Sequence, residues 1–357
     1  MARYVIRRLL QAIPTFFGIT IIAYALMSAS GNPVKTLSFR PGVSDADRQR
    51  LELRLGVNDP WPVQYLRWLL GDDWMRRDTD GDGLADTAIL IDLDADGDGE
   101  PEPPGSRKGV LRGDFGNSFQ QRRPVKDILL ARLPATLELS VTGLLVGTII
   151  GLIIGILAAV TRGGWFDNTT RVLAVVFDAV PSFWLAIMLL LIFGSHFKIL
   201  PIGDRCKLTL EPSCPPIYER WQYMVLPVFV FAKGLISGYS RILRASMLDI
   251  LSKDFILTAR AKGLSNRTVW FKHAARNAMI PIATSLGPSL TGLVAGAVVI
   301  ETIFNYPGVG KTLLDAAVGR DYPVVMASTI YAAIATIIGY LLSDLMYAWI
   351  DPRIRFS

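Results

Sequence analysis

A series of apolar runs, each long enough to form a membrane-crossing helix, constrains this chain more than any other feature. An α-helix rises ~1.5 Å per residue, so about 20 apolar residues are needed to cross ~30 Å of hydrocarbon. The expected spans lie at about Leu9–Met27, Leu137–Val160, Val172–Phe193, Tyr223–Tyr239, Met279–Phe304 and Val324–Ile350. Since 51% of the 357 residues are hydrophobic, we predict an all-α polytopic membrane protein with six transmembrane helices.

The first apolar run follows Arg3, Arg7 and Arg8, and a charged start of this kind also begins a secretory signal peptide. The run is too long for the apolar part of a signal peptide, and no clear small-residue cleavage site follows it. We therefore expect residues 1–29 to be retained as the N-terminus and first span.

The basic residues of the short loops predict how the spans are oriented, because loops rich in Lys and Arg face the cytoplasm. Most of these residues fall in alternate connecting segments and at the two ends, namely 1–8, 161–171, 241–277 and 351–357. Both termini are therefore predicted to be cytoplasmic. Residues 30–135 then form a large extracytoplasmic segment between the first two helices, and 136–357 form the membrane core.

The most basic stretch, Asp254–Pro281, lies between two apolar runs and must sit outside the lipid. Gly263 suits the left-handed end of one short helix, and Ser265 is a good N-cap for the next. We expect a pair of short cytoplasmic helices within 252–277. The stretch could also be only a positively charged anchor of the topology. A DNA-reading helix-turn-helix is disfavoured, because the stretch is tied between two spans, and we expect no nucleic-acid partner.

The sequence NYPGVGKT at Asn305–Thr312 ends like a phosphate-binding P-loop, GxxxxGK[ST]. The first glycine of that motif would be residue 305, which is Asn, and the loop is predicted to lie outside the membrane. ATP binding by this chain is therefore disfavoured. If ATP drives this protein, another subunit binds it.

Two acidic repeats stand out in an insert at about 73–110. Each has the pattern DxDxDG with a further acid three residues later, as at the start of an EF-hand calcium loop. The acids are Asp78, Asp80, Asp82, Asp86, Asp94, Asp96, Asp98 and Glu102. The bidentate Glu of such loops is replaced by Ile89 in the first repeat and by Gly105 in the second. The pattern favours Ca²⁺ binding, and the alternative is a solvated, disordered acidic loop.

The two cysteines, Cys206 and Cys214, lie in one predicted outside loop, where an oxidising environment permits a disulfide. Free thiols are the alternative, and metal ligation is disfavoured because His196 is the nearest histidine. Two ionisable residues fall deep in predicted spans, Asp178 and Lys233. Such groups usually face a bundle interior or a cavity, so they are candidates for a polar translocation path, or else for a structural ion pair.

No nucleophile–base arrangement suggests an enzyme, whereas several stretches resemble the permeases of ATP-binding-cassette (ABC) importers. TARAKGLS at Thr258–Ser265 and HAARNAMIP at His273–Pro281 resemble their cytoplasmic coupling motif. The B-type subunits of the dipeptide/oligopeptide/nickel transporter family are also similar over RGDFGNSF at Arg112–Phe119, ETIFNYPGVGKTLLDAAVGRDYPVV at Glu301–Val325 and DPRIRF at Asp351–Phe356. The resemblance covers nearly the whole chain except about 73–110, which looks like an insertion.

The resemblance implies a type I ABC importer permease fold and a set of residues that contact an ATPase subunit. The family motif EAAxxxG falls on Leu257–Gly263, so Leu257 stands at the Glu position. The implied coupling residues are Thr258, Ala259, Arg260, Ala261, Lys262, Gly263, Leu264 and Ser265.

The implied function is ATP-driven import of di- or oligopeptides through the cytoplasmic (inner) membrane of a prokaryote, by alternating access. The implied partners are a homologous second permease of C type, two ATP-binding subunits, an extracytoplasmic substrate-binding protein and the lipid bilayer. Nickel chelates or oligosaccharides are alternative substrates within the family. Other classes remain open: a membrane-anchored Ca²⁺-responsive module, or a stand-alone secondary transporter or channel. A secondary transporter usually contains an inverted repeat, which the sequence does not show.

Overall fold

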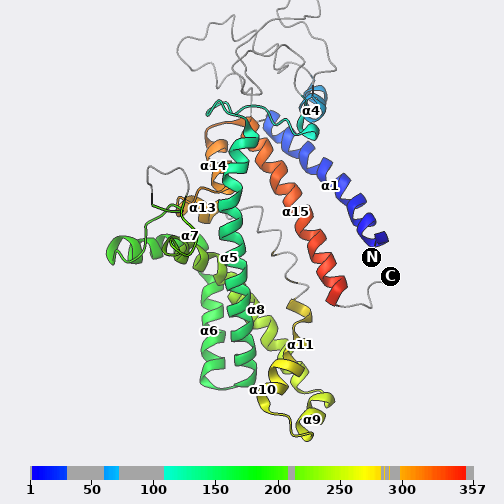
Figure 1. The fold of residues 1–357 in the computed structure, drawn as a ribbon, viewed down its shortest axis with the longest axis vertical. Coiled ribbons are helices and arrows are strands. Elements are labelled where there is room, and N and C mark those ends of the chain that lie inside the picture. Colours follow the sequence, from blue (N-terminus) through cyan, green and yellow to red (C-terminus); the bar gives the residue numbers. More distant parts are fainter. Residues whose placement is uncertain are drawn as a thin grey trace, which may run out of the picture. The chain divides into compact units, whose positions relative to one another are not determined.

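The computed structural model describes residues 2–29, 60–71, 108–207, 214–282, 285, 289 and 298–350. The regular structure of these ranges is helical (Figure 1). The longest helices are α1 (Ala2–Ala29), α5 (Val125–Val160), α6 (Trp165–Ala179), α8 (Gln222–Leu251) and α15 (Tyr322–Ile350). The shorter ones are α4 (Trp61–Leu70), the 3₁₀ turn η1 (Val110–Arg112), α7 (Ser182–Leu189), the π-helix η2 (Leu190–His196), α9 (Asp254–Ala261), α10 (Asn266–Thr268), the π-helix η3 (Val269–Ala274), α11 (Ala275–Ala278), α13 (Val298–Ile303) and α14 (Val309–Val318).

The chain forms two compact units, each assembled from separate parts of the sequence. The first comprises Met1–Leu10, Pro134–Lys311 and Ile334–Ser357, and the second comprises Gln11–Leu133 and Thr312–Ala333. The first unit therefore contains α6, α8 and the basic stretch Asp254–Pro281, together with most of α5.

Four helices in the described part of the chain are long and apolar enough to cross a membrane. They span Leu10–Ala29, Val125–Val160, Gln222–Leu251 and Tyr322–Leu342, which agrees with the first, second, fourth and sixth predicted spans. Half of the fifth predicted span, about Met279–Phe304, falls outside the described residues, including 290–297. The total of six helices therefore stays a prediction.

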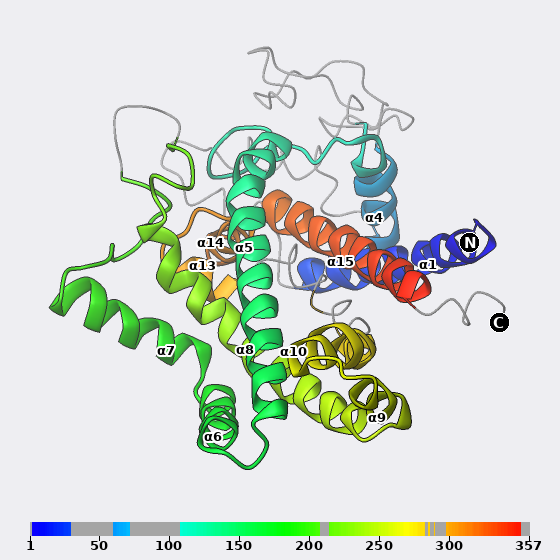
Figure 2. The same ribbon diagram turned by 60° about the horizontal axis from the view of Figure 1, so that its bottom comes forward.

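The third predicted span, about Val172–Phe193, is not one straight helix. α6 ends at Ala179, and the chain continues after Pro181 as α7 and η2, which are bent by 99° from α6. Proline disfavours a helical conformation in the residue before it, and Val180 is accordingly extended, with φ −77° and ψ 120°. α7 therefore turns away from α6 and runs across the direction of α5 and α8 (Figures 1 and 2). The bent pair contributes at most one span.

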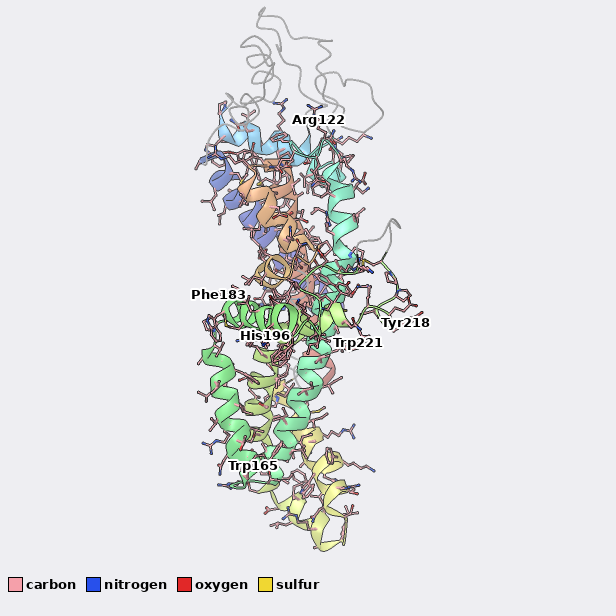
Figure 3. All side chains as sticks on the ribbon, turned by 90° about the vertical axis from the view of Figure 1, so that its left-hand side faces the viewer. Arg122, Trp165, Phe183, His196, Tyr218 and Trp221 are labelled. Atoms are coloured by element: carbon pink, nitrogen blue, oxygen red, sulfur yellow. A yellow bond between two sulfur atoms is a disulfide. The ribbon has the colours of Figure 1, made fainter. Side chains whose placement is uncertain are left out.

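The bent segment exposes large apolar side chains along its length. They are Phe183, Trp184, Ile187, Leu191 and Ile192. In Figure 3 Phe183 lies near the start of the segment and His196 at its end, whereas Trp165 marks the opposite end of α6. A segment with this surface is suited to contact lipid or another protein.

α5 and α8 approach closely through a row of glycines on α5. The glycines recur every fourth residue and so share one face of the helix: Gly143, Gly147, Gly151 and Gly155. A methyl group at these positions would come within 2.5–3.1 Å of a side-chain atom of, in the same order, Phe231, Leu235, Tyr239 and Leu243. The row therefore fixes the register of two helices that run in the same direction, in the manner of close helix pairs in membranes.

In the second unit, the two ends of the acidic insert meet. The backbone of Gly109 lies so close to Gly71 that a methyl group on Gly109 would be 2.1 Å from the Gly71 nitrogen. The Arg112 guanidinium also donates a hydrogen bond to the Leu70 carbonyl. The described residues before and after the insert therefore lie side by side, at Gly71 and Gly109.

Candidate functional site

The predicted coupling stretch forms two short helices that meet at Gly263. The Gly263 N–H donates to the Arg260 carbonyl at 2.9 Å, which closes the last turn of α9. Gly263 has φ +77°, a left-handed conformation that glycine adopts without the strain of a β-carbon. The Ser265 hydroxyl accepts the Thr268 N–H at 3.4 Å and so caps α10. The sequence signals for a helix stop and a helix start both act as expected.

One side of this stretch is buried in a core that it shares with α8. Ile256 and Ala259 of α9 belong to the same cluster of buried side chains as Leu243 and Met247 of α8 and Val269 of η3. In Figures 1 and 2, α9, α10 and α11 accordingly gather beyond the end of α8. A displacement of α9 would therefore reach α8 through packed side chains.

The other side of the stretch faces solvent and mixes charge with apolar surface. Of the implied coupling residues Thr258–Ser265, only Ala259 is buried. Leu257 is 58% exposed and Leu264 is also exposed, next to the basic side chains of Arg260 and Lys262. Exposed apolar side chains with a basic rim are suited to contact another protein.

Asp178 and Lys233, the residues predicted to lie along a polar path, are not hydrogen-bonded to each other. Lys233 is buried, and its ammonium donates to the carbonyls of Phe177 at 2.8 Å and Val180 at 2.6 Å. These carbonyls lie where α6 ends, and a cation there satisfies acceptors that the helix leaves unpaired. Asp178 instead forms an ion pair with Arg241 of α8. Lys233 therefore stabilises the bend after α6 by pairing with its backbone carbonyls.

Two further polar contacts hold α6 against α8. The Ser237 hydroxyl donates to the Ala174 carbonyl at 2.7 Å. Nearer the start of α6, the buried Asp167 carboxylate pairs with the Arg244 guanidinium through two hydrogen bonds. Sequence reasoning missed both contacts, because their partners lie 63 and 77 residues apart and carry no local pattern.

Near the start of α8, one carboxylate accepts hydrogen bonds from three side chains. Glu138 of α5 accepts hydrogen bonds from Arg205 at 2.6 Å, from Arg220 at 2.6 Å and from the Tyr306 hydroxyl at 2.9 Å. Burial raises the pKa of the Tyr306 phenol, and the neighbouring Glu138 charge raises it further. Tyr306 therefore stays protonated and keeps donating to the carboxylate.

The predicted disulfide between Cys206 and Cys214 is present in the structure. Arg205 directly precedes the bridged loop and Arg220 follows it, so the Glu138 cluster holds both ends of the loop. Arg220 also donates through Nε to the carbonyl of Pro215 at 2.6 Å. The loop is thus fixed to the membrane core by ion pairs as well as by its own bridge.

The P-loop-like sequence holds a carboxylate of its own chain. At the start of α14, the Lys311 N–H donates to Glu301 Oε2 at 2.9 Å, and the Thr136 hydroxyl donates to Glu301 Oε1 at 2.9 Å. A methyl group on Gly308 would lie 2.4 Å from the Glu301 oxygens. Helix N-termini bind anions, and the buried Glu301 side chain already occupies this one. The glycines therefore make room for a carboxylate and not for a phosphate.

The eight acids of the predicted calcium repeats lie outside the described residues. Within the described ranges, no group of three or more His, Cys, Asp or Glu side chains is placed to hold a metal ion. Calcium binding by the insert therefore stays a prediction from sequence.

Several long apolar helices, with a pair of short helices packed onto the end of α8, are typical of a membrane protein. The chain belongs to the family of binding-protein-dependent transport system inner membrane components, whose model matches residues 151–356. It is accordingly a multi-pass inner-membrane protein, and the predicted resemblance to ABC importer permeases is confirmed.

Known members of this family match the chain over its whole length. It is 34% identical over 357 residues to the oligopeptide transport system permease protein AppB of Bacillus subtilis (strain 168), covering 100% of both chains. It is 34% identical over 374 residues to the dipeptide transport system permease protein DppB of Escherichia coli (strain K12), covering 99% of each. The glutathione transport system permease protein GsiC of the same organism is 31% identical over 361 residues and is covered completely.

A solved structure shares the fold. The chain superposes on the MetNI methionine ABC transporter, in an inward-facing conformation, with a TM-score of 0.50 and 16% sequence identity. The match covers 63% of this chain and 96% of the other. At this identity the match speaks for the fold alone, and it agrees with the permease architecture expected from the sequence.

Proposed function

We propose that this protein is a permease subunit of an ATP-driven importer that moves di- or oligopeptides into the cytoplasm by alternating access. The observation that carries the proposal is the full-length similarity to permeases named for oligopeptide and dipeptide transport, at 34% identity. A local likeness could reflect a shared fold, whereas a match over 99–100% of both chains includes the loops and the ends of the helices.

The coupling role falls on Thr258–Ser265, with Leu257 beside it. Its buried side, Ile256 and Ala259, is packed into the cluster that contains Met247 of α8. Its exposed side offers apolar and basic side chains to an ATP-binding subunit. Closure of that subunit would then move α9, and the packed cluster would pass the movement to α8 as a rigid-body displacement.

ATP itself is bound by the partner subunits in this proposal. Support comes from Glu301, which fills the helix N-terminus that a P-loop would use for phosphate. A second permease, two ATP-binding subunits and an extracytoplasmic binding protein complete the proposed importer. The Cys206–Cys214 loop and the acidic insert then face outward, and both termini face the cytoplasm.

The coupling role is tested by replacing Leu257, which is 58% exposed, with arginine. A charge at an apolar contact should weaken docking of the ATP-binding subunit by at least ~10-fold, equivalent to about 1.4 kcal/mol. ATP-dependent uptake of a labelled dipeptide into proteoliposomes containing the assembled transporter should fall in proportion.

The matched control is Leu111→Arg, since Leu111 is 51% exposed and lies in the predicted extracytoplasmic segment. This variant should transport like the unmodified protein. Unchanged uptake by Leu257→Arg, at normal levels of membrane-inserted protein, would remove the coupling role from this stretch.

A further inference from the structure

In the second unit, the turn before α5 and the turn before α15 meet around the buried carboxylate of Asp321. This carboxylate accepts the Phe119 N–H at 3.0 Å and the Gln120 N–H at 3.3 Å. The Gln120 side chain also donates to the Gly319 carbonyl at 2.9 Å. The two turns are therefore held together as one surface.

Each of these turns carries an arginine in a left-handed conformation. Arg122 has φ 50° and Arg320 has φ 55°, a region that is strained for a residue with a β-carbon and that glycine adopts freely. Both arginines are exposed, and neither forms an ion pair within the described part of the chain. Residues held in this way cluster at functional sites, so the two guanidinium groups are candidates for binding an anion.

Further positive charge gathers at the same end of the unit. Arg123 and Lys126 are exposed and follow Arg122 closely in the sequence, and Asp127 beside them brings one negative charge. The start of α5 and the start of α15 lie side by side here (Figures 1 and 2), and a helix N-terminus carries a partial positive charge. We call this surface, Arg122, Arg123, Lys126 and Arg320, the basic face.

The strongly acidic insert is attached close to the basic face. Residues 72–102 contain twelve acidic and two basic residues, a formal net charge of −10. After the insert, the Gly109 carbonyl accepts the Asp114 N–H at 3.1 Å, and the Asp114 carboxylate accepts the Gly116 N–H at 2.9 Å. The Gly116 carbonyl accepts the N–H of Val125, the first residue of α5, at 3.0 Å. A compact turn therefore joins the end of the insert to the basic face.

The length of the insert is sufficient for its acids to reach this surface. Glu102, its last acid, precedes Gly109 by seven residues, which can span up to roughly 23 Å when extended. Acids nearer the middle of the insert can reach further. Because both ends of the insert are tied to the same unit, such a contact is intramolecular and has an effective concentration in the millimolar range.

We propose that the basic face is a docking site for the acidic insert of the same chain. A guanidinium binds a carboxylate through paired hydrogen bonds, and the basic face offers three guanidinium groups and one ammonium to a segment of opposite charge. Each exposed ion pair is weak on its own, so the docking depends on several contacts that a tethered partner makes together. The inference goes beyond the proposed function and does not require it.

Zero-length crosslinking tests which partner lies on the basic face, in the assembled transporter with its extracytoplasmic binding protein present. A carbodiimide joins an amine to a carboxylate where the two groups touch, and Lys126 supplies the amine. In a calcium chelator, peptide mass spectrometry should find Lys126 joined to acids of 72–102. The yield should fall at least ~10-fold between about 0.1 M and about 1 M salt, since the screening length shortens from ~10 Å to ~3 Å.

Lys198 is the matched control in the same sample, because it is also exposed and also has a positive φ, at 55°. It should form no link to the insert. Equal linking of Lys126 and Lys198 would mean that the insert contacts the surface at random. That result overturns the proposal, as does linking of Lys126 to the binding protein in place of the insert, or no linking of Lys126 at all.

The double variant Arg122→Gly and Arg320→Gly tests the two left-handed arginines. Glycine relieves the backbone strain, so the variant should melt at the same temperature as the unmodified chain or higher. It removes two charges and should lower linking of Lys126 to the insert at least ~10-fold. Lys198→Gly relieves the same kind of strain elsewhere and should leave this linking unchanged. Undiminished linking in the double variant overturns the assignment of docking to the basic face.

Replacement of residues 73–107 by a Gly-Ser linker separates the insert from other occupants. In vesicles that contain phosphatidylglycerol, Lys126 should react with a water-soluble acylating reagent at least ~10-fold faster in this variant, whereas the rate at Lys198 should not change. Protection of Lys126 that survives the deletion assigns the face to another partner, namely lipid headgroups where it requires phosphatidylglycerol. That result contradicts the proposal, and so does equally rapid reaction with and without the insert.

Discussion

Glu301 is a buried carboxylate whose hydrogen-bond partners come from two distant parts of the chain. It accepts from Thr136, 165 residues away, and from the Lys311 backbone. The sequence shows an acid close to a glycine-rich loop, and it shows that the loop departs from a P-loop at Asn305. It does not show that the acid fills the loop, because hydrogen bonding between distant residues leaves no local pattern. The same holds for Lys233. Its position in an apolar run predicts a buried cation, but not the two carbonyls to which it donates.

Two glycines at the base of the insert allow the close approach of Gly109 to Gly71 to be tested. Gly109 and Gly113 both have positive φ, at 77° and 84°, but among the described residues only Gly109 has backbone atoms in the way of a methyl group. Gly113→Ala should cost about 1 kcal/mol from strain alone. Gly109→Ala should cost about 1–3 kcal/mol more, because the Gly71 backbone must move. Thermal unfolding of the purified chain compares the two variants, and equal melting temperatures would contradict the close approach.

At the scale of elements, hydropathy predicted the first, second, fourth and sixth spans, but it could not predict the shape of the third. The run at about Val172–Phe193 is as apolar as a straight span requires. Pro181 and its effect on Val180 divide it into α6 and the segment α7–η2. The sequence contains the proline, but many membrane helices tolerate one: α5 continues through Pro134 and α8 through Pro227. Whether a proline kinks or ends a helix depends on which group donates hydrogen bonds to the carbonyls that the proline leaves unpaired. Here that donor is the Lys233 ammonium.

The packing of α5 against α8 gives a second prediction. Gly155→Ala would place a methyl group 2.9 Å from both the Leu243 side chain and the Ser240 carbonyl. The helices would have to separate, and overpacking of this kind costs about 1–3 kcal/mol. The melting temperature of the transporter in detergent should fall.

Gly238→Ala on α8 is the control for this change. It makes the same substitution within a helix, but its methyl group meets no atom of the described residues within 4 Å. Alanine also favours helix by about 1 kcal/mol over glycine, so this variant should melt at the same temperature or higher. A larger loss for Gly238→Ala than for Gly155→Ala would refute the register of the two helices.

At the scale of the whole molecule, we expect the insert to be separable from the transport function. Its ends meet at Gly71 and Gly109, so the chain can be closed there without altering the rest of its unit. The acids of the two predicted calcium repeats all lie between these two glycines in the sequence. We therefore expect the insert to be an addition to a permease and not a part of its membrane core.

Replacement of residues 73–107 by a short Gly-Ser linker should leave ATP-dependent peptide uptake unchanged. It should also abolish Ca²⁺ binding by the purified full chain, measured by equilibrium dialysis. The double variant Asp80→Asn and Asp96→Asn keeps the length of the insert and removes one central ligand from each repeat. It should weaken Ca²⁺ binding at least ~10-fold, equivalent to about 1.4 kcal/mol. Calcium binding that survives the deletion would disprove the assignment to the repeats.

The sequence by itself determined the class of protein and the helix signals at Gly263 and Ser265, whereas the cytoplasmic position of that stretch stays a prediction. These features depend on composition and on neighbours within a few residues, where backbone preference and hydrophobic length act directly. The tertiary structure decided the bend after α6 and the register of α5 and α8. It also decided that Asp178 pairs with Arg241, while Lys233 donates to backbone carbonyls. Those outcomes depend on which distant groups meet, because a buried charge takes whichever partner the packing of the helices brings within reach.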